Sequence, residues 1–245
     1  MRLSLRILPL LVFAFTGVLL AQTAEELIAK NIQAKGGSEK IKAIHSLRKS
    51  GKMQSGSFSI DVVEESLVPD RLRQSVSLQG MTQVMAYDGS GTTAWQLNPF
   101  GGRRDPELLG EDEQRGLVEA ADFYGPLIDY EKKGNTIAYL GHELVDGDDT
   151  YRLRVTLKNG DIIYYYLDPD TYLEIKTETI QHIRGAVREF LSEFGSYKKV
   201  DGVYFPFSVA SGSKESSDRA QLTYDKIEAN VPIAESGFKF PTKAK

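Results

Sequence analysis

The chain has 245 residues, 41% hydrophobic and 26% charged, which is ordinary for a globular protein. Its 34 acidic and 30 basic residues give a formal net charge of −4, which disfavours nucleic acid and anionic membrane surfaces, since both bind basic faces. The absence of cysteine excludes disulfides, thiol nucleophiles, sulfur–zinc sites and a lipid-modified cysteine.

Residues 1–21 have the features of a secretory signal peptide. Arg2 and Arg6 form a basic start, residues 7–20 are apolar and uncharged, and Ala21 offers a small residue for cleavage. The apolar run is too short to span a bilayer, so we expect its removal and a periplasmic mature chain, residues 22–245, that forms one domain. An uncleaved N-terminal anchor is the alternative. The mature net charge is −6, from 28 basic and 34 acidic residues.

Two helices are predicted at the start of the mature chain. Thr23 can cap the first, over residues 23–35, and a pair of glycines then ends it. Ser38 is expected to cap a short second helix over residues 39–44.

From residue 46 the hydrophobic period changes to two, which predicts strands joined by short connections. The predicted ranges are residues 46–55, 57–68, 70–79, 81–88 and 92–98. The apolar faces of the second, third and fifth of these strands are formed by Phe58, Ile60 and Val62, by Leu72, Val76 and Leu78, and by Trp95 and Leu97.

Residues 99–133 interrupt this pattern. Asp105 and Pro106 are expected to cap and start a helix over residues 107–123, which the glycines within it weaken. The insertion is longer than a routine connection between strands, which favours a lid or binding element. A plain helix that plugs one side of the sheet is the other interpretation.

A long meander dominates the second half of the chain. Strands are predicted over residues 135–145, 151–158, 162–167, 172–179, 186–197, 203–211 and 219–229. Asn159 and Gly160 predict a two-residue type I′ hairpin turn, because both tolerate a positive φ. Alternation in the meander places Val155 and Leu173 on apolar faces, and Tyr165 lies within a run of three tyrosines.

Catalytic and metal-binding patterns are missing from the sequence. The three histidines are isolated, and neither a Gly-x-Ser-x-Gly elbow nor a phosphate-binding glycine loop occurs. His142 and Glu143 lie near three aspartates, but their spacing matches no oxygen-ligand loop and a solvated turn explains them. We therefore expect no catalytic residues, no metal, no cofactor and no enzymatic activity.

Several short motifs together resemble one family. They are residues 35–41 (KGGSEKI), 50–53 (SGKM), 86–89 (AYDG), Trp95, 98–100 (NPF), 159–160 (NG), 164–168 (YYYLD), 172–175 (YLEI), 201–202 (DG) and 205–206 (FP). Each is weak alone, but their order over nearly the whole mature chain is similar to that of bacterial outer-membrane lipoprotein-sorting proteins, the LolA-like family in its broad sense.

This resemblance implies a fold and a function. The fold would be α+β but mainly β: an incomplete, unclosed antiparallel β-barrel of about eleven strands, with helices covering the concave side as a lid over a hydrophobic cavity. Family members ferry lipoprotein acyl chains across the periplasm, and structural cousins bind lipids or sense mislocalised lipoproteins. The chain departs from the best-known carriers in its opening motif and tyrosine-rich hairpins, and their functional arginine matches no position here.

The resulting hypothesis is a periplasmic, non-enzymatic carrier or binder of lipid or lipoprotein acyl chains. We expect a monomer that binds no nucleic acid. An envelope sensor or interaction module that docks a membrane or regulatory protein is the alternative. The predicted cavity residues are Phe58, Ile60, Val62, Leu72, Val76, Leu78, Trp95, Leu97, Val155, Tyr165 and Leu173. The predicted lid residues are Phe100, Leu108, Leu109, Leu117, Phe123 and Tyr124.

Overall fold

The computed structural model describes residues 22–91, 93–183 and 185–241. The predicted signal segment lies outside these residues. Three α-helices and two 3-10 turns occur in the described part: α1 Ala24–Lys35, α2 Ser38–Lys42, η1 Pro99–Gly101, α3 Glu111–Ala121 and η2 Glu235–Gly237. The strands are β1 Ser46–Ser55, β2 Phe58–Leu67, β3 Arg71–Leu78, β4 Met81–Tyr87, β5 Ala94–Leu97, β6 Glu107–Leu108, β7 Thr136–Val145, β8 Asp148–Thr156, β9 Ile162–Leu167, β10 Glu174–Ile183, β11 Ala186–Gly195, β12 Lys198–Val200, β13 Val203–Phe205, β14 Ser208–Ser213 and β15 Ala220–Ala229.

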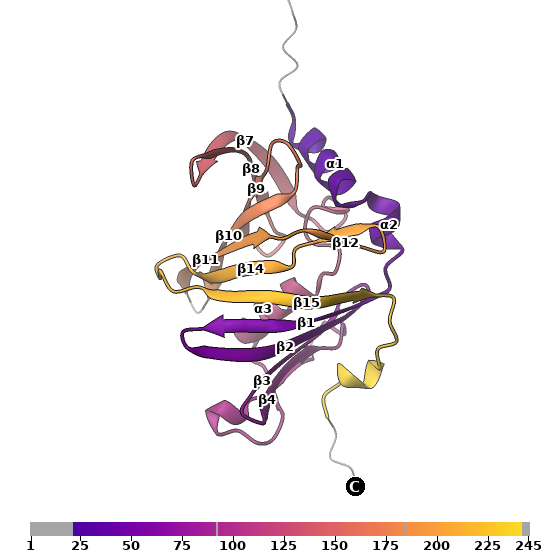
Figure 1. Ribbon diagram of the computed structural model, residues 1–245, viewed down its shortest axis with the longest axis vertical. Coiled ribbons are helices and arrows are strands. Elements are labelled where there is room, and N and C mark those ends of the chain that lie inside the picture. The colour runs from indigo at the N-terminus through magenta and orange to yellow at the C-terminus, as the bar shows by residue number, and fades with distance from the viewer. Residues whose placement is uncertain (1–21, 92, 184, 242–245) are drawn as a thin grey trace, which may run out of the picture.

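Within the described chain, thirteen strands form one antiparallel sheet in the order β6-β5-β4-β3-β2-β1-β15-β14-β11-β10-β9-β8-β7. The C-terminal strand β15 lies between β1 and β14 and joins an N-terminal wall, β1 to β6, to a C-terminal wall (Figure 1). The outer strands β6 and β7 do not pair with each other, so the curled sheet stays open. The predicted incomplete antiparallel barrel is therefore confirmed, with β12 and β13 as a separate small ribbon.

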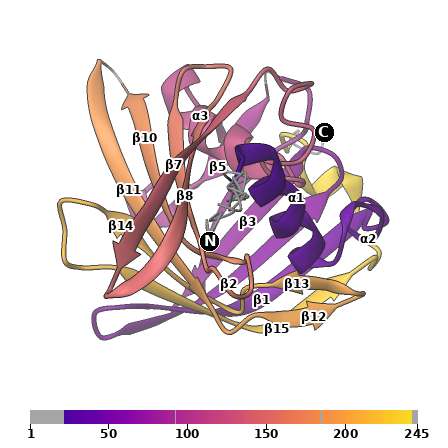
Figure 2. The same ribbon diagram turned by 90° about the horizontal axis from the view of Figure 1, so that it is seen from above.

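Helix α1 closes part of the concave side (Figure 2). Its predicted cap is confirmed, because the Thr23 hydroxyl accepts the Glu26 N–H and the Glu26 carboxylate accepts the Thr23 N–H. Leu27 and Ile28 of α1 are buried against Leu153 and its neighbours on β8 and β9. The predicted cap of α2 is wrong: Ser38 is its first helical residue, and Gly37 occupies the cap position without a side-chain bond.

The predicted start of the middle helix is also wrong. Glu107 and Leu108 extend the sheet as β6, paired with β5, and the Leu109 N–H donates to the Ala94 carbonyl at 2.9 Å. Helix α3 therefore begins only at Glu111, after Gly110. Pairing to the free edge of β5 outweighs the local helix signal of Pro106.

The hairpin between β8 and β9 differs in its turn type. The Gly160 N–H donates to the Leu157 carbonyl at 2.9 Å, and the Leu157 N–H donates to the Asp161 carbonyl at 2.8 Å. Gly160 has a φ of +90°, whereas Asn159 does not have the positive φ that a type I′ turn requires. The loop thus has three residues and ends in a glycine bulge. Asn159 stabilises it through its side-chain oxygen, which accepts the Asp161 N–H at 2.9 Å.

Candidate functional site

The strand register identifies which side chains share the concave face. Directly paired residues of antiparallel strands point to the same side of a sheet. Lys49 of β1 pairs with Glu64 of β2, and Glu64 pairs with Gln74 of β3. One row further along, Ser66 pairs with Leu72, and Leu72 pairs with Tyr87 of β4. This row contacts α3, so the face of Glu64 and Leu72 is the concave one.

A pocket of about 330 Å³ lies where the two walls meet under the helical segments. Its N-terminal wall includes Lys49 and Glu64, and its C-terminal wall includes Tyr165 and Thr179. Further lining comes from Lys35, Ile41, Ile44, Leu47, Ser66, Ala120, Asp122, Phe123, Tyr124, Ile128, Ile163, Glu174, Thr177, Phe194, Tyr197, Val203, Tyr204, Phe205 and Pro206. The size is that of a small-molecule site, but charged groups interrupt the apolar lining.

The first charged group in the pocket is the ion pair between Lys49 and Glu64. The Lys49 Nζ lies 2.7 Å from Glu64 Oε1, and the Gln74 amide donates to Glu64 Oε2 at 3.1 Å. Burial alone would raise the pKa of Glu64, but the Lys49 charge and the two hydrogen bonds hold it below its usual value. Burial alone would likewise lower the pKa of Lys49, and Glu64 raises it instead. Both groups therefore stay charged at neutral pH.

The second pair joins α1 to the opposite wall. The Lys35 Nζ lies 2.9 Å from Glu174 Oε1, and the Tyr197 hydroxyl donates to the Glu174 carbonyl at 2.8 Å. The Glu174 side chain is 8% exposed. Burial alone would raise the pKa of Glu174, but Lys35 holds it below the usual value, while burial raises the pKa of Tyr197. The pocket thus contains two ion pairs of zero net charge, and the Asp122 carboxylate, which also lines it, accepts from Lys133 Nζ at 2.7 Å.

Helix α3 contacts the two walls in different ways. On the N-terminal wall, Leu117 and Ala121 pack against Leu72 and Tyr87. On the other wall the contacts are polar: Glu119 accepts hydrogen bonds from the Asn159 amide at 2.8 Å and the Gln181 amide at 2.7 Å, and Arg115 Nη1 donates to the His182 carbonyl at 2.9 Å. Burial and the nearby Asp161 carboxylate raise the pKa of Glu119. Helix α3 is therefore held on the N-terminal wall by apolar packing and on the C-terminal wall by hydrogen bonds.

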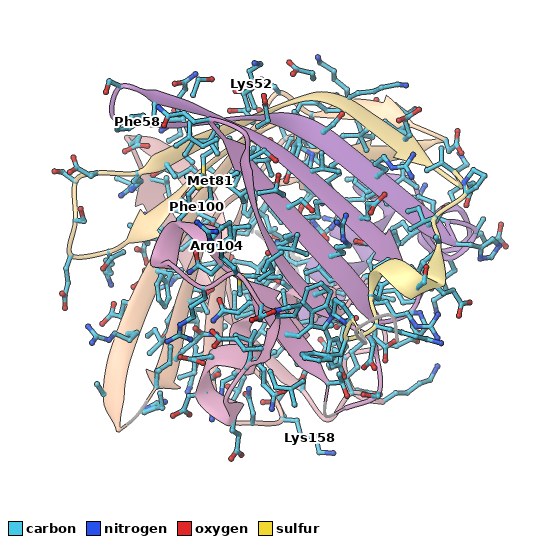
Figure 3. All side chains as sticks on the ribbon, turned by 90° about the horizontal axis from the view of Figure 1, so that it is seen from below. Lys52, Phe58, Met81, Phe100, Arg104 and Lys158 are labelled. Atoms are coloured by element: carbon cyan, nitrogen blue, oxygen red, sulfur yellow. The ribbon has the colours of Figure 1, made fainter. Side chains whose placement is uncertain are left out.

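The structure brings together only part of the predicted cavity set. Val62, Leu72, Val155 and Tyr165 are buried on the concave side, and Tyr165 lines the pocket. The half-buried or exposed residues Phe58, Ile60, Val76 and Leu78 share the concave face of β2 and β3 beyond the helical cover. Figure 3 shows Phe58 and Met81 at the same end of this wall, near Phe100.

Three predicted cavity residues lie elsewhere. Trp95 and Leu97 pair with Ala86 and Val84, which places them on the convex face. There Trp95 Nε1 donates to the Phe238 carbonyl at 2.8 Å, so the C-terminal segment accounts for its burial. Leu173 precedes β10, and the register shift between Glu174 and Lys176 makes Glu174, rather than Leu173, line the pocket.

The predicted lid residues also separate. Leu109 and Leu117 pack between α3 and the sheet, while Phe123 and Tyr124 line the pocket. Leu108 is 62% exposed and pairs with Trp95, so it lies on the convex side, and Phe100 is 40% exposed in η1.

Sequence reasoning missed the charged pocket residues Lys35, Lys49, Glu64, Asp122 and Glu174. A signal was present for Glu64, because it continues the apolar alternation of Phe58, Ile60 and Val62 and so points inward. Nothing comparable marked Lys35 at the end of α1 or Glu174 beside a bulge.

Among the residues that the structure describes, no group of three or more His, Asp or Glu side chains is placed to hold a metal ion. His142 Nδ1 instead lies 2.5 Å from Asp149 Oδ2. No helix of the described part is long and apolar enough to cross a membrane.

An open antiparallel half-barrel with helices on its concave side defines the LolA-like fold class, and the resemblance expected from the sequence is confirmed at this level. One solved structure that matches is a LolA superfamily protein from Nitrosomonas europaea, with a TM-score of 0.59, 14% identity, and coverage of 89% of this chain and 98% of that chain. A DUF1329 family protein from Desulfovibrio piger matches with a TM-score of 0.59 and 10% identity, over 88% of this chain and 96% of that one.

A domain assigned to the outer-membrane lipoprotein-sorting proteins of Vibrio parahaemolyticus has a TM-score of 0.56 and 14% identity, over 86% of this chain and 97% of that one. At such identities the similarity is one of fold. A scan against protein-family models and a sequence search of curated proteins both gave no match.

Proposed function

We propose that this protein is a periplasmic, non-enzymatic binder or carrier of lipid or lipoprotein acyl chains. The observation that carries the proposal is the pocket of about 330 Å³ between the two walls of an open half-barrel, covered by the end of α1, by α2 and by the segment that follows α3. The fold shared with a lipoprotein-sorting domain supports it. The signal-like residues 1–21 support export.

Binding would be passive. Each methylene of an acyl chain that leaves water contributes about 0.8 kcal/mol, and the concave face offers apolar side chains for such contacts. Helix α3 positions the segment that follows it: Glu119 is hydrogen-bonded to the C-terminal wall, and Leu117 packs on the N-terminal wall. The segment after α3 contributes Phe123, Tyr124 and Ile128 to the pocket lining, so an outward movement of this segment would open the pocket.

Native mass spectrometry of protein purified gently from its own periplasm tests the proposal. A carrier should retain bound lipid, identified after extraction, at up to one equivalent. An apo mass together with one stoichiometric protein partner in envelope pull-downs would contradict a carrier and favour the interaction module instead.

A further inference from the structure

The pocket is a poor environment for hydrocarbon alone. Lys49 and Glu64, and Lys35 and Glu174, are paired inside it, and the two carboxylate side chains are 16% and 8% exposed. An acyl chain packed against these pairs would remove their remaining water and return no hydrogen bond, which is costly for charged groups. A polar group placed there could exchange hydrogen bonds with them.

An apolar strip begins directly beyond the Lys49–Glu64 pair. Along β2 the inward side chains after Glu64 are Val62, Ile60 and Phe58, in that order. The inward neighbours on β1, β3 and β4 are mostly apolar too: Met53, Val76, Leu78 and Met81. Phe58 and Met81 are 53% and 43% exposed, so the far end of the strip is open (Figure 3).

The strip is long enough for one acyl chain. Phe58 precedes Glu64 by six positions on β2, and a rise of about 3.3 Å per residue gives about 20 Å. One leaflet of a bilayer is about 15 Å of hydrocarbon, half of a core of about 30 Å. The concave face therefore changes from charged to apolar along β2, and the apolar part is long enough for one acyl chain.

We propose that the site takes a lipid with a zwitterionic head group, the head beside the Lys49–Glu64 and Lys35–Glu174 pairs and the acyl chain along the strip toward Phe58 and Met81. This assignment rests on the proposed lipid-binding function and adds the orientation and the head chemistry. A zwitterion accepts from Lys49 and donates to Glu64, so no buried charge loses its partner. An anionic head would compete with Glu64 and leave that carboxylate unpaired.

Photo-cross-linking of the wild-type protein tests the orientation. Two lysophosphatidylethanolamine probes are used, one with a diazirine at the chain terminus and one with a diazirine next to the head. The chain-terminal probe should label β2 and β4 near Phe58 and Met81, and the head-proximal probe should label peptides containing Tyr165 or Tyr197. Exchanged labelling would overturn the orientation while acyl binding stands. Absence of binding by either probe would overturn the lipid-binding function as well.

Head selectivity is measured with one acyl chain carrying three heads: zwitterionic phosphoethanolamine, anionic phosphoglycerol and neutral glycerol. The zwitterionic lipid should bind about tenfold more tightly than the other two, and free glycerophosphoethanolamine should not displace it. Lys49→Met/Glu64→Met should abolish this preference. The matched control is Lys52→Met/Asp61→Met, which removes an exposed pair on the opposite face of the same two strands and should keep it.

Equal affinity for the three heads would refute the head assignment without touching the carrier function. Displacement by the free head at lipid-like affinity would refute the apolar strip as part of the site. Circular dichroism of both double variants shows that they are folded before affinities are compared.

Discussion

Lys49 and Glu64 form an ion pair 2.7 Å apart on the concave face of the sheet, at the boundary between the pocket and the apolar strip. The pair connects β1 and β2, the two strands of the N-terminal wall that lie nearest β15. Because of this position, the concave face offers a ligand both charged groups and apolar side chains.

Removal of one partner of this pair should destabilise the protein. Lys49→Met leaves Glu64, whose side chain is 16% exposed, without its cation, and we expect a loss of about 3 kcal/mol in the free energy of unfolding. Lys52→Met, from an exposed pair, should cost about 0.5 kcal/mol or less. Urea unfolding followed by circular dichroism measures both, and equal losses would contradict the buried role of Lys49.

Glu119 should make the docking of α3 pH-dependent. Its pKa is raised in the folded protein above the usual 4.5 by burial and by Asp161. The contribution of protonated Glu119 to stability is therefore complete below about pH 4.5. It is lost as the pH rises through the raised pKa that Glu119 has in the folded protein.

Glu119→Gln keeps a neutral side chain at every pH. We expect its melting temperature to exceed that of the wild type by a few degrees at neutral pH, on a scale of about 2–4 °C per kcal/mol, with the difference vanishing in acid. Calorimetry across this pH range checks the trend. A difference that grows toward low pH would show that the carboxylate is stabilised by folding instead.

Gly36 should tolerate no side chain. Its φ is +130°, and a Cβ there would lie 2.3 Å from the Gly202 carbonyl oxygen, where the α1–α2 corner contacts the β12–β13 turn. Gly36→Ala should cost about 2 kcal/mol or more. Gly56→Ala is the matched control, because Gly56 has a φ of +58° but open space around it, and should cost about 1 kcal/mol. Thermal unfolding distinguishes the two, and equal costs would disprove the close contact at Gly36.

The alternation of β2 was sufficient to predict that Phe58, Ile60 and Val62 share the concave face, because a period of two is local information. The face of Trp95 was not predictable in this way, since both sides of β5 are buried. Its convex side is covered by the C-terminal segment: the Phe238 carbonyl, 143 positions away in the chain, accepts the Trp95 N–H, and Phe240 packs on the indole. Contacts between residues so far apart in the sequence cannot be predicted from the alternation of apolar and polar residues within one strand.

Two other differences have local causes that sequence rules do not resolve. Glu174, rather than the predicted Leu173, faces the pocket because a bulge shifts the register of β10. Leu108 joined a strand because the edge of β5 was free to pair. The polar character of the pocket depends on Lys35 and Glu174, which meet only when α1 packs on the C-terminal wall.

The most direct test of lipid binding at the pocket is to fill the pocket with a side chain. Thr179 lines the pocket, and Thr136 is exposed on the edge strand β7. Thr179→Trp should weaken binding of a fluorescent lysophosphatidylethanolamine by about tenfold or more, because the indole occupies space the ligand needs, while Thr136→Trp should leave the affinity unchanged. Binding by folded Thr179→Trp at the wild-type affinity would contradict the pocket between the two walls as the ligand site.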